Sequence, residues 1–188
     1  MKKIMITGDN SRAAELQAAF SLLGLTVSVE KEPTAEQLKH TEMLIVCLPA
    51  EKQSAERSIT EMEDWEGVEA LYDRWACGYL RLVHRALPLL APEARICVWT
   101  TEDASVNGCR ETGDFGRRMS LAAIHQASML LFHTIRPQGK TMRLCAAGKA
   151  EEAVQCFLQK RSFEADNLPH SDENRLSLRG SHGCELPW

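Results

Sequence analysis

Short apolar segments of strand length alternate with amphipathic segments of helix length along the whole chain. The strand-like segments are residues 3–7, 25–29, 43–48, 95–100, 142–146 and 175–178. The helix-like segments are residues 11–23, 34–39, one long helix within 60–90, 118–135 and 150–159. Regular alternation of this kind is typical of a parallel sheet that carries helices on both faces. The pattern therefore predicts an α/β fold with a mostly parallel sheet of about six strands.

The composition is that of an ordinary globular protein. The 188 residues are 44% hydrophobic and 26% charged, and we expect a single domain, residues 1–188. A formal net charge of −4 gives no reason to expect nucleic-acid binding. No apolar run reaches membrane-spanning length, so we expect a cytoplasmic protein without a membrane partner. The seven cysteines include no C-x-x-C pair and are expected to be reduced, mostly buried thiols.

The order of several short motifs resembles that of the short-chain dehydrogenases/reductases. Residues 5–14 are similar to the family's turn T-G-x-x-x-G-x-G, and residues 44–50 fall where a strand runs into N-N-A-G. The strand at residues 95–101 resembles the one that carries the catalytic serine, and residues 119–123 fall where Y-x-x-x-K opens a helix. The resemblance covers nearly the whole chain. It implies a Rossmann-like, doubly wound sheet that has been shortened by one strand–helix unit.

The glycine-rich turn is where this sequence departs from the family's cofactor site. Such a turn needs glycines because the backbone adopts conformations open only to glycine and approaches the pyrophosphate closely. Only Gly8 is kept, while Arg12 and Ala14 replace the second and third glycines. Glu30 is the candidate acceptor for ribose hydroxyls, and Ala50 keeps one position of N-N-A-G. We therefore expect either no cofactor or weak NAD(P) binding.

Two interpretations of Arg12 remain open at this point. Its guanidinium could be a ligand for a phosphate group, or its side chain could be solvated on the first turn of the helix. Base rates favour the solvated side chain.

The residues at the family's catalytic positions do not support its chemistry. In the family, a tyrosine donates a proton, a lysine lowers the pKa of that tyrosine, and a serine orients the substrate. Met119 and Ala123 stand at the tyrosine and lysine positions, and Thr101 keeps a hydroxyl at the serine position. No tyrosine or lysine lies between Tyr79 and Lys140.

These departures favour a catalytically silent protein that binds a nucleotide or a protein partner as a regulatory or structural subunit. The alternative is an NAD(P)-dependent oxidoreductase with a non-standard proton donor. No metal site is predicted, because His125 and His133 are two helical turns apart, too far to share one ion. Histidines packed at an internal interface are the better interpretation.

Two helices carry more apolar surface than one face of a sheet covers. The helix at residues 118–135 is apolar around most of its circumference. The long helix within residues 60–90 carries a stripe of Trp65, Val68, Tyr72, Trp75, Tyr79, Leu82 and Ala86. In the family the equivalent helices pair across a two-fold axis. The resemblance therefore implies a homodimer through residues 60–90 and 118–135.

Overall fold

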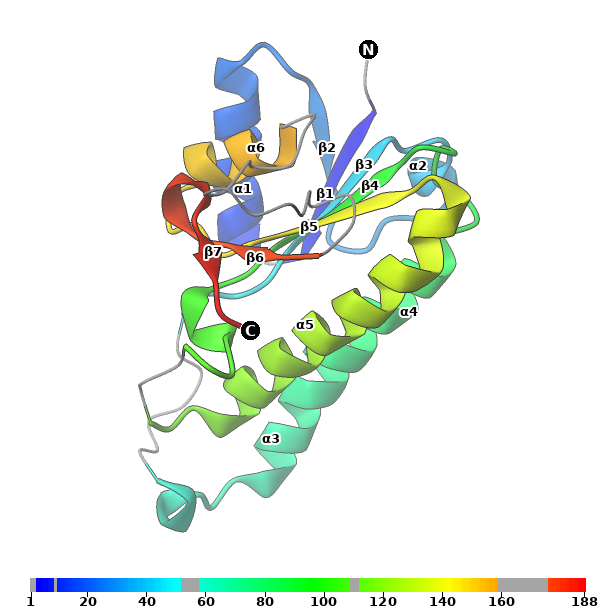
Figure 1. The fold of residues 1–188 in the computed structure, drawn as a ribbon. Helices are drawn as coiled ribbons and strands as arrows, with labels where there is room; N and C mark the ends of the chain where they lie inside the picture. The colour runs from blue at the N-terminus through cyan, green and yellow to red at the C-terminus, as the bar shows by residue number, and fades with distance from the viewer. Residues whose placement is uncertain (1–2, 9, 52–57, 109–111, 159–175) are drawn as a thin grey trace.

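A seven-stranded sheet forms the centre of the molecule (Figure 1). The computed structural model describes residues 3–8, 10–51, 58–108, 112–158 and 176–188. The order of the strands across the sheet is β2-β1-β3-β4-β5-β6-β7. Their bounds are β1 Ile4–Gly8, β2 Val27–Val29, β3 Met43–Cys47, β4 Arg95–Trp99, β5 Thr141–Cys145, β6 Leu178–Arg179 and β7 Glu185–Leu186.

The predicted parallel α/β sheet is confirmed, with one strand more than the sequence suggested. Strands β1 to β6 run parallel, and β7 pairs with β6 in the antiparallel direction. The extra strand has only two residues and precedes Pro187, so its sequence has too few positions to show alternation. The last parallel strand begins at Leu178, whereas the sequence placed it at residues 175–178.

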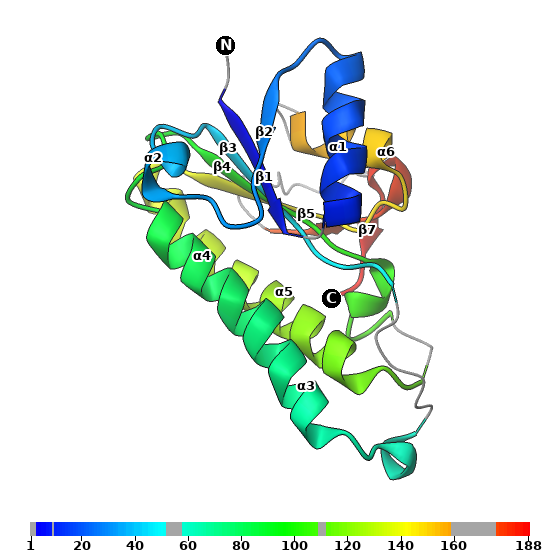
Figure 2. The same cartoon turned by 180° about the vertical axis from the view of Figure 1, so that it is seen from behind.

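Helices cover both faces of the sheet (Figure 2). Helices α1 (Asn10–Leu22) and α6 (Ala150–Leu158) lie against one face. Helices α4 (Gly78–Ala86) and α5 (Phe115–Ile135) lie against the other, and the short α2 (Ala35–Leu38) contacts α4. The strands supply both layers because successive side chains point to opposite faces. In β3, for example, Leu44 and Val46 pack toward α4 and α5, while Ile45 packs toward α1.

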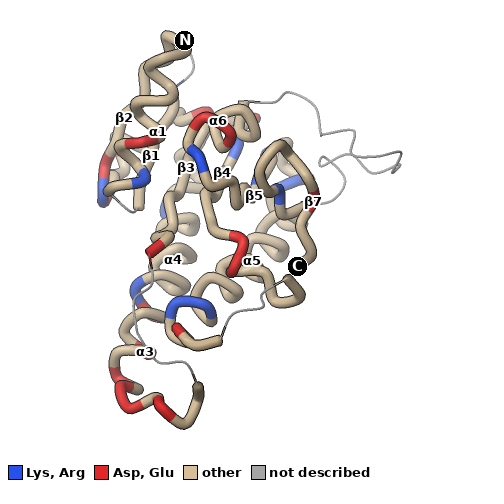
Figure 3. The backbone as a smooth tube through the Cα atoms, turned by 90° about the vertical axis from the view of Figure 1, so that its left-hand side faces the viewer, with Lys and Arg blue, Asp and Glu red and all other residues tan. Residues whose placement is uncertain are grey.

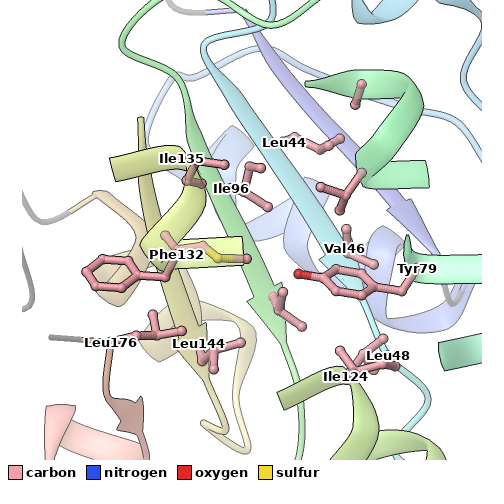
Figure 4. Packing of buried hydrophobic residues seen from close by; sticks show 14 of the residues in the cluster. Leu44, Val46, Leu48, Tyr79, Ile96, Ile124, Phe132, Ile135, Leu144 and Leu176 are labelled. Carbon is pink, nitrogen blue, oxygen red and sulfur yellow. The ribbon is translucent and has the colours of Figure 1, made fainter. Parts of the chain in front are cut away.

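The core under α4 and α5 is built from aliphatic side chains and few aromatic ones (Figure 4). Ile124, Phe132 and Ile135 of α5 are fully buried on the strands. Tyr79 of α4 is also buried, and its hydroxyl lies 2.8 Å from Ser128 Oγ. Burial raises the pKa of Tyr79 well above its ordinary value. Tyr79 is therefore part of the core and does not belong to an exposed aromatic stripe.

The long helix is interrupted by a π-helical turn. Helix α3 (Trp65–Tyr72) leads into a π turn at Asp73–Cys77, which continues directly into α4. Helix α3 extends past the sheet beside the first turns of α5 and contains no fully buried residue (Figure 1). Trp65 and Tyr72 are 55% and 40% exposed. None of the helices in the described ranges combines the length and the apolarity needed to cross a membrane.

Candidate functional site

The carboxyl ends of the parallel strands meet at one edge of the sheet, where open α/β folds bind their ligands. Two hollows open along this edge and share Ser11, in the first turn of α1. The larger measures about 1120 Å³ and lies between the ends of β1 and β3 and helix α4. The smaller measures about 550 Å³ and lies over the ends of β4 and β5. The candidate site therefore has two compartments.

Gly8 ends β1 and starts the turn into α1. Its φ is +107°, a conformation that L side chains rarely adopt. A Cβ atom at this position would collide with the carbonyl oxygen of Cys47 in the neighbouring strand β3. The glycine that the sequence keeps is thus required by the packing of β1 on β3. Gly8 also lines the larger hollow.

Arg12 lies across the carboxyl ends of β3 and β4. Its Nη1 donates to the carbonyl oxygens of Leu48, at 2.7 Å, and Trp99, at 3.3 Å, and its Nη2 donates to that of Thr100, at 3.0 Å. The guanidinium also stacks on the Trp99 ring, with its carbon 3.8 Å from the ring centroid. Trp99 in turn donates its indole N–H to the carbonyl oxygen of Ala147, at 2.8 Å.

Both interpretations of Arg12 from the sequence need correction. The residue is only 7% exposed, so its side chain is not solvated on the first turn of the helix. The guanidinium donates to main-chain carbonyls, so it is not held out toward a phosphate either. The sequence could not indicate this because the acceptors are main-chain oxygens that lie 36 to 88 residues away along the chain.

The other residues expected to bind a cofactor do not gather around Arg12. Ala14 is exposed on α1 and lines neither hollow. Glu30 follows β2, and its Oε1 accepts a hydrogen bond of 2.7 Å from Gln37 Nε2 in α2; it also lines neither hollow. Ala50 does line the smaller hollow with Arg12. Of the five predicted positions, the edge thus brings together Gly8, Arg12 and Ala50.

The loop after β4 carries a charged cluster that the sequence did not reveal. Thr101, the residue predicted at the serine position, lines the smaller hollow, and its Oγ1 donates to the carboxylate of Asp103. Arg117, only 1% exposed, donates to Asp103 and, through Nε at 2.6 Å, to Asp114. Burial opposes ionisation of Asp103, yet its bonds from Arg117 and Thr101 hold its pKa below the ordinary value. The cluster ties the loop to the start of α5.

Helix α5 begins at Phe115, three residues earlier than the sequence suggested, and the residues at the family's tyrosine and lysine positions do not face the site. Met119 is 53% exposed, Ala123 packs against the α4 and α5 core, and neither lines a hollow. The residue of α5 that reaches the loop of Thr101 is Arg117. The placement of positions 119 and 123 at the site is therefore wrong. A shift of the alignment by a few residues would not supply the missing pair, because no tyrosine or lysine lies between Tyr79 and Lys140.

A second polar pair lies just behind Thr101. His125 Nε2 is 2.9 Å from Thr100 Oγ1, and the imidazole is 3% exposed. Burial lowers the pKa of His125 to about 4, so the ring is neutral at pH 7. The imidazole and the Trp188 ring pack at right angles, with centroids 6.0 Å apart. In the described parts of the chain, no group of three or more His, Cys, Asp and Glu is arranged to hold a metal ion.

This architecture is the Rossmann-type fold of the short-chain dehydrogenases/reductases. A Burkholderia multivorans protein assigned to that class, with bound NADP, matches with a TM-score of 0.75 at 13% identity, over 100% of both chains. A carbonyl reductase from Pseudomonas aeruginosa PAO1 in complex with NADP matches with a TM-score of 0.71 at 15% identity, over 100% of both chains. Carbonyl reductase Sniffer of D. melanogaster matches with a TM-score of 0.68 at 13% identity, over 100% of both chains. No family model and no curated protein sequence matches this chain.

Proposed function

We propose that this protein is a nucleotide-binding member of this fold class that lacks tyrosine–lysine reductase chemistry and acts as a regulatory or structural subunit. The observation that carries the proposal is the position of Arg12 across the ends of β3 and β4. Arg12 lines the smaller hollow, and its neighbour Ser11 lines both hollows. A guanidinium held at this position would obstruct an extended dinucleotide that spans the two.

The loop after β4 supports the same proposal. The hydroxyl of Thr101 already donates to Asp103, and Asp103 is held by Arg117. The smaller hollow, where Thr101 lies, is lined by no tyrosine and no lysine among the described residues, so it lacks the two groups that a tyrosine–lysine pair supplies. Tyr79 and Lys31 line the larger hollow instead, and the Tyr79 hydroxyl lies 2.8 Å from Ser128 Oγ in the core. What the edge does offer is an open pair of hollows of a size suited to small ligands.

The second candidate is an NAD(P)-dependent oxidoreductase with a non-standard proton donor. The likeness to carbonyl reductases, including one in complex with NADP, favours this candidate. It requires that Arg12 leave its three carbonyl acceptors so that the edge can open. It also requires a proton donor, and Thr101 is the hydroxyl that lines the smaller hollow.

Cofactor oxidation and ligand binding separate the two candidates. NADH and NADPH oxidation is followed with a panel of aldehydes and ketones, and a nucleotide panel is titrated by calorimetry. We expect no turnover and binding of at least one nucleotide. Turnover that is lost in Thr101→Val but kept in Thr134→Val, an exposed threonine of α5, would establish the oxidoreductase. A protein that binds no nucleotide would overturn the proposed nucleotide-binding function.

We also propose that the protein works as a homodimer through α3, α4 and α5. Large apolar side chains are exposed on these helices, namely Trp65, Tyr72, Leu80, Met119 and Leu130. Such a set on a monomer marks an interaction surface.

A further inference from the structure

The larger hollow combines a cationic rim with apolar walls. Among the described residues that line it, Lys31, Arg74, Arg81 and Arg85 are cationic and Glu32 alone is acidic. Arg81 forms an ion pair of 2.7 Å with Asp73. No ion pair engages Lys31, Arg74 or Arg85 within the part of the chain that the structure describes. Three exposed cations therefore surround one cavity, a field that concentrates anions.

The walls of the same hollow present a flat aromatic surface. Trp75 lines it from the π-helical turn and is partly buried. Leu48, Pro33 and Pro49 line it from the ends of strand β3 and the loop after β2. Arg74 also lines this hollow, so an aromatic side chain and a cation border the same cavity. This pairing suits a ligand that carries both a planar ring and an anionic group.

The smaller hollow has the opposite charge. Glu15, Glu51 and Glu102 line it, and its one described cation is Arg12, which is bound to main-chain carbonyls. An anionic ligand is therefore repelled from this compartment and attracted to the other. Figure 3 shows a separate group of acidic residues at the start of α3, which lies outside both hollows. The two compartments do not suit the two phosphate-bearing halves of a dinucleotide.

We propose that the larger hollow is a mononucleotide site, in which the base stacks on Trp75 and the phosphate groups bind Lys31, Arg74 and Arg85. The inference rests on the proposed nucleotide binding and specifies its ligand class, a phosphorylated nucleoside with a single base. The volume of about 1120 Å³ accommodates such a ligand without entry into the smaller hollow. Arg12 then acts as the specificity residue that excludes the second half of a dinucleotide.

The test titrates the full chain by calorimetry with AMP, adenosine, inorganic phosphate, nicotinamide mononucleotide, NAD and NADP. Tryptophan fluorescence is recorded in parallel. We expect AMP to bind more tightly than adenosine or phosphate, and more tightly than either dinucleotide. The double variant Arg74→Gln/Arg85→Gln should weaken AMP binding about tenfold or more, since it removes two charge-assisted contacts. The double variant Arg136→Gln/Lys149→Gln removes the same charge outside both hollows and should bind AMP like the unmodified protein.

Trp75→Leu provides a second, independent variant. It should weaken AMP binding about tenfold by loss of stacking and abolish the fluorescence change. AMP binding that is unaffected by the Arg74/Arg85 pair and by Trp75→Leu would place the nucleotide elsewhere and overturn the inference, while the proposed function would stand. Dinucleotide binding tighter than AMP binding would overturn it as well. Failure of every nucleotide to bind would instead overturn the proposed function.

Discussion

Arg12 and Trp99 form a stacked pair that joins the start of α1 to the end of β4, with the guanidinium carbon 3.8 Å from the ring centroid. The pair lies where the turn after β1 would otherwise leave the edge of the sheet open. The same guanidinium donates to three carbonyl oxygens, so stacking and hydrogen bonding act together. One side chain thus supplies both a structural link and an obstacle at the candidate site.

Replacement of Arg12 by glycine should open the edge. We expect the unmodified protein to show no micromolar affinity for NAD or NADP and Arg12→Gly to bind at least one of them more tightly, as measured by calorimetry. Arg12→Met is the matched control, because it keeps the volume and removes the donors. Both variants should lose about 2 kcal/mol of stability, since buried carbonyl oxygens lose a charged donor. Micromolar dinucleotide binding by the unmodified protein would contradict this account of Arg12.

Stability should decrease in mild acid because of His125. Its pKa is about 4 in the folded protein and about 6.5 in the unfolded chain. Between these two pH values the unfolded chain binds a proton at this residue and the folded protein does not. The free energy of unfolding therefore rises with pH in this range, and it decreases as the pH falls from 6.5 toward 4. The full loss is about 3 kcal/mol.

Urea denaturation at a series of pH values measures this slope. His125→Gln can keep a hydrogen bond to Thr100 and cannot titrate, so it should flatten the profile between pH 6.5 and 4. His133→Gln, at an exposed position on the same helix, should leave the profile unchanged. If both variants retain the slope, another group is responsible for it.

The Arg117 cluster should be the most sensitive ionic feature of the fold. Arg117→Met removes the charged donor that Arg117 supplies to the carboxylates of Asp103 and Asp114, and Asp114 is only 2% exposed. Removal of one member of a buried pair costs about 3–5 kcal/mol. Arg81→Met breaks the exposed pair with Asp73 and should have no measurable effect. Chemical denaturation compares the two variants, and equal small losses would show that the cluster contributes little.

Self-association should depend on the exposed face of α5. Light scattering should give about twice the chain mass of 21.0 kDa at micromolar concentration. Leu130 is 61% exposed, so Leu130→Glu has little cost in a monomer but places a charge in the proposed contact. We expect this variant to be monomeric. Leu22→Glu, 81% exposed at the end of α1, is the control and should remain dimeric. A mass of about 21 kDa for the unmodified protein would rule out the dimer.

The strands that carry the core were predictable because their apolar runs are continuous, as in residues 43–47 and 96–99. The π turn at Asp73–Cys77 was not, since it inserts one residue into an otherwise continuous helical pattern, and the Gly78 that follows it lies inside the helix and does not end it. The burial of Arg12 and Arg117 could not be predicted from the sequence either. Both are long polar side chains that sequence alone places in solvent, and their burial depends on partners that only the folded chain brings near.

Gly8 shows how packing alone can preserve one residue of a binding motif. The collision that any side chain at this position would have with Cys47 constrains the residue whether or not a ligand is bound. Position 12 is held by different contacts, those of Arg12 with main-chain carbonyl oxygens, and position 14 is exposed. A chain of this fold can therefore keep this glycine while the residues around it depart from the motif. Its fold matches a solved structure at 13% identity, although no family model matches its sequence.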